Sequence, residues 1–265
     1  MPPDVRSSYE IEQTFAEAQR ALDKVQSAGG TVPIAGMEKF APAWGGPRPE
    51  GSVPVPAVYA GVSGLGPVLK VYEHQGFDLD LLHLGTPHIE SAVRYRDGLA
   101  YQAVGKEVHA WRWEEVAAIL SDFVQHVGTH SGEGYPVYEY LLVKQNGDKL
   151  LLDSDVKDVN DLGAAIKQAA YALIGPPLGQ RYKLGEAVTF GPVTVQQPNG
   201  IQMEGKPFAW AAIQDVKIEN GRLAVTLRDG KKHSVRAKAI PNVEILCQLL
   251  GIKCDDFDLT YWPGL

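Results

Sequence analysis

The chain lacks long apolar runs, has few cysteines and carries no surplus of basic residues. No stretch approaches the roughly 18 to 20 consecutive apolar residues that a membrane-spanning helix needs. Two cysteines, Cys247 and Cys254, cannot form a disulfide framework. Lys and Arg total 25 against 32 Asp and Glu, which argues against a general nucleic-acid binder. The first residues also lack the basic and apolar regions of a secretory signal, so we expect a cytoplasmic protein, at most peripheral at the membrane.

Residues 1–28 are predicted to contain an amphipathic helix over 8–26, because apolar residues recur at steps of three and four. We expect this N-terminal helix to dock on its own protein or to pair with another helix, and so to recruit a protein partner or to oligomerise. Insertion at a membrane surface is the less favoured alternative, since the polar face is rich in Glu and Gln instead of Lys. The apolar stripe consists of Ile11, Phe15, Ala18, Leu22 and Val25.

Residues 29–67 differ in composition, with nine glycines and seven prolines and almost no periodicity. Such a segment buries little apolar surface, so a mobile or extended linker is expected. The prolines between 47 and 56 are also compatible with a polyproline ligand for a partner domain, but a spacer is the favoured interpretation.

From residue 68 the pattern becomes that of short strands separated by turns. Asp97-Gly98 and Asn146-Gly147 are strong hairpin signals. A helix over 158–174 follows and is expected to end at Gly175-Pro176-Pro177. Strands then return from residue 188, and a final helix over 242–250 is expected to have Asn242 as its N-cap. The predicted strands of the first series are 68–73, 91–95, 99–104, 137–144 and 149–153. Those of the second series are 188–190, 193–196, 200–203, 208–210, 216–218, 223–227 and 233–236.

The two series share more than their order. Trp113 is followed at +3 and +6 by Val and Ile, and Trp210 is followed at the same offsets by Ile and Val. This agreement predicts two similar modules, residues 68–178 and 179–252, followed by a tail over 253–265. Each module is predicted to be a bent antiparallel sheet or partly open barrel closed by its C-terminal helix. The expected fold class is therefore α+β, with two modules that are pleckstrin-homology-like (PH-like).

Three segments carry a resemblance to a known family: GLAYQAVGKEVHAWRWEEVAAI, YLLVKQNGDKLLLDSDVKDVNDLGAAI and the C-terminal FAWAAIQDVKIENGRLAV with IPNVEILCQLL. They resemble an uncharacterised bacterial family of tandem PH-like domain proteins, over about residues 94–252. The shared motifs are hairpins, a Trp corner and a closing helix, without a catalytic set. Many such relatives carry membrane spans ahead of the modules, where this chain has a Gly/Pro-rich linker.

Charge is divided unevenly between the modules. Residues 180–252 hold ten basic and six acidic residues, whereas 68–179 hold nine and sixteen. Lys232, Arg236 and Lys238 are expected on one strand face, with Lys231 at the preceding turn. These four residues are the candidate binding site for an acidic ligand or partner. The alternatives are a solvated strand face, docking on the acidic first module, or contact with anionic lipid head groups.

No nucleophile elbow, phosphate-binding loop, zinc-protease motif or dinucleotide fingerprint is present. His126 and His130 are separated by Gly128 and Thr129 and lack a third ligand nearby, so neither a metal site nor a cofactor is expected. We therefore expect a non-enzymatic binding or scaffold protein that contacts a protein partner. The alternatives are peripheral association with anionic lipid, and an enzyme with an unrecognised site between the modules.

Overall fold

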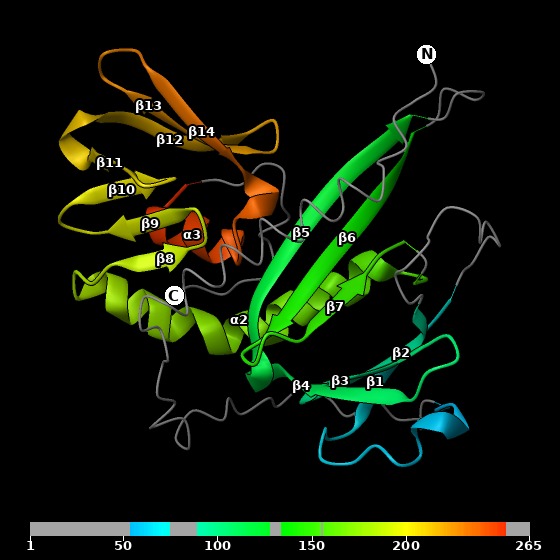
Figure 1. Cartoon of the computed structure of the whole chain (residues 1–265). Coiled ribbons are helices and arrows are strands. Elements are labelled where there is room, and N and C mark those ends of the chain that lie inside the picture. Colours follow the sequence, from blue (N-terminus) through cyan, green and yellow to red (C-terminus); the bar gives the residue numbers. More distant parts are fainter. Residues whose placement is uncertain (1–53, 75–88, 128–133, 155, 253–265) are drawn as a thin grey trace.

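The structure, a computed structural model, describes residues 54–74, 89–127, 134–154 and 156–252. Within these ranges the chain forms four antiparallel sheets and two α-helices (Figure 1), which confirms the expected α+β class. The predicted N-terminal helix over 1–28 and the tail over 253–265 lie outside the described residues. Neither helix in these ranges combines the length and apolar character needed to cross a membrane.

The first half of the described chain contains two sheets, of four and three strands, and then a helix. A short 3-10 turn, η3 (Trp113–Glu115), connects the two sheets, and α2 (Val159–Lys183) follows them. The sheet strands are β1 (Val68–Glu73), β2 (Ile89–Tyr95), β3 (Gly98–Ala103), β4 (Val108–Arg112), β5 (Val116–Val127), β6 (Gly134–Lys144) and β7 (Lys149–Leu152).

The second half has the same order of elements. Four strands form one sheet, η4 (Trp210–Ala212) leads into a three-stranded sheet, and η5 (Ala237–Ala239) precedes α3 (Val243–Leu250). The three-stranded sheets of both halves carry a register shift at the same place, after the first residue of β5 and of β12. The strands are β8 (Val188–Phe190), β9 (Val193–Gln196), β10 (Gly200–Met203), β11 (Lys206–Ala209), β12 (Ile213–Glu219), β13 (Arg222–Leu227) and β14 (Lys232–Arg236).

The two Trp corners, which are the short turns η3 and η4 that begin with Trp113 and Trp210, make matching contacts. The indole N–H of Trp113 donates to the main-chain oxygen of Arg96 at 2.9 Å, and that of Trp210 donates to the main-chain oxygen of Gln196 at 3.1 Å. Arg96 directly follows β2, the second strand of the first half, and Gln196 is the last residue of β9, the second strand of the second half. The corners differ in burial, because Trp113 is only 5% exposed whereas Trp210 is half-buried.

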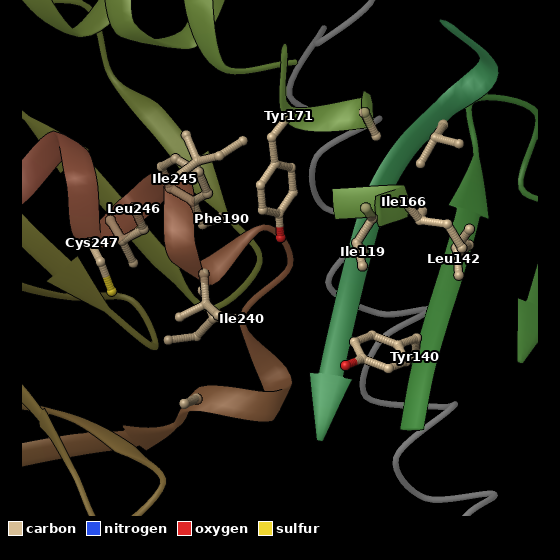
Figure 2. Packing of buried hydrophobic residues seen from close by; sticks show 14 of the residues in the cluster. Ile119, Tyr140, Leu142, Ile166, Tyr171, Phe190, Ile240, Ile245, Leu246 and Cys247 are labelled. Atoms are coloured by element: carbon tan, nitrogen blue, oxygen red, sulfur yellow. The ribbon is translucent and has the colours of Figure 1, made fainter. Parts of the chain in front are cut away.

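One apolar cluster extends through both halves. Figure 2 shows Tyr171 of α2 between Ile245 and Leu246 of α3 on one side and Ile119 and Leu142 of the β5–β6 hairpin on the other. Because α2 contributes to the cores of both halves, it joins them into one packed body.

Helix α2 continues past the predicted stop at Gly175-Pro176-Pro177 and ends at Lys183, so that prediction was wrong. Both prolines are exposed, while Gly175 and Gly179 on the other side of the helix are buried. A proline removes one main-chain donor, but tertiary packing can keep a helix intact across it. The contact between α2 and β8 supplies such packing, and the helix therefore runs through the predicted module boundary at residue 178.

Asn242 precedes α3 but does not cap it with its side chain, contrary to the sequence-based expectation. Its side-chain oxygen accepts from the Ile119 N–H at 2.9 Å, and its side-chain nitrogen donates to the Ala117 oxygen at 3.2 Å. Its own main-chain N–H donates to the Ile119 oxygen at 2.8 Å. Asn242 therefore pairs with the edge of β5 and links the second half to the first.

The end of the predicted linker is packed instead of extended. Residues 54–67 include a 3-10 turn, η2 (Ala57–Tyr59), and Tyr59 and Leu65 are only 2% and 3% exposed. Their side chains pack on Val93 and Ala100, on the face of the first sheet that points away from the main core. The Tyr59 hydroxyl also donates to the Ser91 main-chain oxygen at 2.7 Å, which fixes the segment to β2.

Candidate interaction surface

The outward face of the β12–β14 sheet carries most of the predicted site residues. In β14, Lys232 and Arg236 are exposed while Val235 is buried, which confirms the expected alternation within this strand. Lys231 lies in the turn before the strand. Lys238 was expected on the same strand face, but it lies in η5 beyond the strand and is half-buried, so this placement was wrong.

Arg222 is a residue of this surface that the sequence analysis missed. It pairs directly with Arg236 across β13 and β14, and both side chains are exposed. The Arg222 guanidinium donates to the Ser234 hydroxyl at 2.8 Å and to the Ser234 main-chain oxygen at 3.2 Å. The turn at Asp229-Gly230 was a usable signal, because a tight turn sets the register of the whole hairpin.

Neighbouring charges on this sheet are partly neutralised. Lys217 lies 2.7 Å from Glu219, Lys232 lies 4.0 Å from the same carboxylate, and Lys231 lies 2.8 Å from Asp229. The hydrogen bond from Lys217 lowers the pKa of the Glu219 carboxyl, so this group stays ionised and keeps its partners paired. Among the described residues, no carboxylate forms an ion pair with Arg222 or Arg236.

A small hollow of about 50 Å³ lies beside β14, against the β10–β11 hairpin. Its walls include Met203, Lys206 and Val235, and the rings of Phe208 and His233 meet there with their centroids 4.6 Å apart. Pockets for small organic ligands are usually about 300–1,000 Å³, so this hollow is too small to enclose one. This hollow therefore does not provide a small-molecule site beside the basic face.

Polar groups also meet where the two halves join, between α2 and α3. The Glu244 carboxylate accepts from Lys167 at 2.9 Å and from the Tyr171 hydroxyl at 2.7 Å, and it is only 7% exposed. These groups are bonded to one another, and they connect the helices. In the described part of the chain, no three His, Cys, Asp or Glu residues gather as a metal site would require. His126 lies in β5, while His130 lies outside the described residues.

The comparisons with known proteins give a family and a distant structural likeness. Among curated proteins, none matches the sequence. A solved structure titled "Structure of the Spt16D Pob3N heterodimer" is similar over 57% of this chain and 92% of that chain, with 14% sequence identity and a TM-score of 0.23. At that TM-score the likeness carries no argument about fold or function. Residues 86–256 match a family described as "Family of unknown function (DUF6585)", and the chain therefore belongs to that family.

Proposed function

We propose that this chain is a non-enzymatic binding or scaffold protein built from two PH-like modules. Its second module contacts an acidic surface of a protein partner through the outward face of β12–β14. The binding residues are Arg222, Lys232 and Arg236, with Lys231 at the edge of the face. Lys238 contributes charge nearby, although it does not share the strand face.

The repeated order of elements supports the part of this proposal that concerns the modules. Each half has a four-stranded sheet, a Trp corner, a three-stranded sheet and a helix. Each corner also has a glycine on the adjacent strand, Gly98 or Gly200, where a Cβ would clash with the main-chain oxygen of Trp111 or Phe208. Such matched details support two modules of the same kind, because they lie at positions where packing leaves few alternatives.

We choose this surface because of one observation. Arg222 lies directly opposite Arg236 on an exposed face of the sheet. Like charges that face each other across two strands destabilise a sheet. Carboxylates of an acidic partner would neutralise this repulsion on binding, since each guanidinium can bind a carboxylate with two parallel hydrogen bonds. The basic residues of this face are exposed, which favours recognition of another surface over turnover of a substrate.

The test uses the full chain with poly-L-glutamate as an acidic polypeptide probe, and titrates binding at low and high salt. The variant Lys232→Glu/Arg236→Glu should weaken binding by about tenfold or more, because four units of charge change at the surface. Raising the salt concentration should weaken binding by the unsubstituted chain as well. Vesicles of phosphatidylcholine with phosphatidylserine form the second arm of the experiment.

The matched control is Lys106→Glu/Lys157→Glu, which makes the same charge change at two exposed lysines of the first half. Lys144 is unsuitable as a control, since its side chain is only 12% exposed and lies against Glu115 and the Trp111 ring. Equal weakening by the two double variants would overturn the proposal, because only net charge would then matter. Binding to the vesicles but not to poly-L-glutamate would also overturn it, in favour of anionic lipid.

A further inference from the structure

The β5–β7 sheet of the first half is buried on both faces. One face belongs to the main core, through Ile119, Tyr140 and Leu142. The other face carries a separate apolar cluster, which we call the outer apolar face. Its residues are Ala118 (3% exposed), Leu120 (6%), Leu141 (7%) and Val143 (1%), with Leu151 partly buried beside them.

The fold does not require this second face to be apolar. Aligning the two halves on Trp113 and Trp210, and on the turns at Gly147 and Gly230, gives the corresponding positions of the β12–β14 sheet. Four of those five positions are polar, and none of the four is buried. The corresponding residues are Asp215, Lys217, Ala224, Thr226 and Ser234. An apolar outer face is therefore particular to the first half, and it indicates a surface that another element covers.

The covering element must belong to this chain, because the outer apolar face is buried within a single copy. Among the described hydrophobic residues, Leu151 of β7 is the one that packs against the four buried members. Neighbouring side chains can bury a small residue within a sheet, as they bury Ala224, but large side chains such as Leu120 and Leu141 need a covering element. Apart from Leu151, the apolar partner of this face is therefore not found among the described hydrophobic residues.

We propose that residues 8–26 are this cover, as an amphipathic helix lying across the outer apolar face. Their apolar stripe is Ile11, Phe15, Ala18, Leu22 and Val25. A helix of this length spans about 27 Å and is about 10 Å wide. Three strands at a spacing of about 4.8 Å present a width of about 10 Å, so one helix is sufficient. The stripe then contacts the sheet opposite α2, which covers the other face.

The sequences of the other segments fit this role less well. Residues 128–133 contain no large apolar side chain. In 253–265 the apolar residues Phe257 and Leu259 alternate with acidic or other polar residues, the period of a strand instead of a helix. In 75–88, Phe77, Leu81 and Leu84 stand at helical spacing, but Gly76, Gly85 and Pro87 leave room for only about two turns. Residues 27–53 are interrupted throughout by glycines and prolines. Residues 8–26 provide the longest apolar stripe at helical spacing among these segments, and no Gly or Pro interrupts it. The chain between residue 26 and residue 54 is long enough to let the helix reach the sheet.

The experiment measures how fast a thiol reagent labels Ala118→Cys, a small substitution on the outer apolar face, in a Cys254→Ser background. The other natural cysteine, Cys247, is buried. In the full chain the introduced thiol should react slowly. Phe15→Asp should raise the labelling rate by about tenfold or more, because a charge on the stripe releases the helix. Leu22→Asp, also on the stripe, should have the same effect.

Gln13→Asp is the matched control, since it adds the same charge on the opposite side of the helix and should leave the rate unchanged. A benzophenone side chain placed at position 15 should also cross-link to residues 141–143, which gives a readout that does not depend on the cysteine variant. Unchanged labelling with Phe15→Asp and Leu22→Asp would overturn the proposal. So would labelling that rises on removal of 253–265 alone, or protection that disappears on dilution as a dimer dissociates.

Discussion

Asn242 offers the sharpest test of how the two halves are joined. Its left-handed backbone, with φ of 53°, suits glycine as well as asparagine, so Asn242→Gly removes the side chain without straining the main chain. The substitution deletes the hydrogen bonds to the Ile119 N–H and the Ala117 oxygen. It also leaves the buried Ile119 N–H without its partner, which costs about 1–3 kcal/mol. With the second lost bond, the free energy of unfolding should fall by about 2–4 kcal/mol.

Asn220 provides the matched control for this measurement. It also has a left-handed backbone, with φ of 52°, but it lies exposed in the β12–β13 turn. Asn220→Gly should therefore change the free energy of unfolding by less than about 0.5 kcal/mol. In urea, with an m-value of about 3 kcal/mol/M, the midpoint of Asn242→Gly should fall by about 1 M. Equal midpoints for the two variants would refute the reasoning that the Asn242 side chain holds the halves together.

Two further predictions concern the first half. Gly163→Ala should lower the free energy of unfolding by about 2 kcal/mol or more, because the new methyl group would overlap the Tyr140 ring, whereas Gly61→Ala meets no atom and should leave the melting temperature unchanged. Burial pushes the pKa of Asp161 upward, but hydrogen bonds from Tyr72 and Lys70 outweigh it and hold that pKa below its usual value. The resulting stability is present above the unfolded pKa of about 3.9 and is lost as pH falls through the folded pKa. Asp161→Asn should therefore destabilise the protein at neutral pH and progressively less in acid, and a difference that stays constant with pH would contradict this.

Local sequence patterns were sufficient for most strands and turns. Four strands, β1, β8, β9 and β10, begin and end at the predicted residues, because turn residues with few conformational choices flank them. By contrast, β4 and β5 were not predicted as strands. The start of β5 is buried on both faces, so its residues show no alternation, and Trp113 with its spaced apolar residues was interpreted as a corner alone.

The wrong predictions for the end of α2 and for the role of Asn242 arose from contacts between residues that are distant in sequence. No local pattern shows that α2 contacts β8. The prolines at 176 and 177 therefore predicted the end of the helix, whereas packing against β8 keeps it intact to Lys183. Asn is a residue type that is preferred at helix N-caps, but the side chain of Asn242 binds the main chain of β5 instead. Arg222 was missed for the opposite reason. The turn at Asp229-Gly230 already determined its place beside Arg236, but the register was not carried across the hairpin.

Helix α2 has a practical consequence for anyone who wishes to study the halves apart. Its 25 residues extend over about 37 Å, and buried residues occur from Val159 in its first turn to Gly179 near its end. Cutting the gene at residue 178 would divide α2 and expose apolar surface on both fragments. Anyone seeking a soluble piece should keep the entire helix with either half, and should expect the half without it to aggregate.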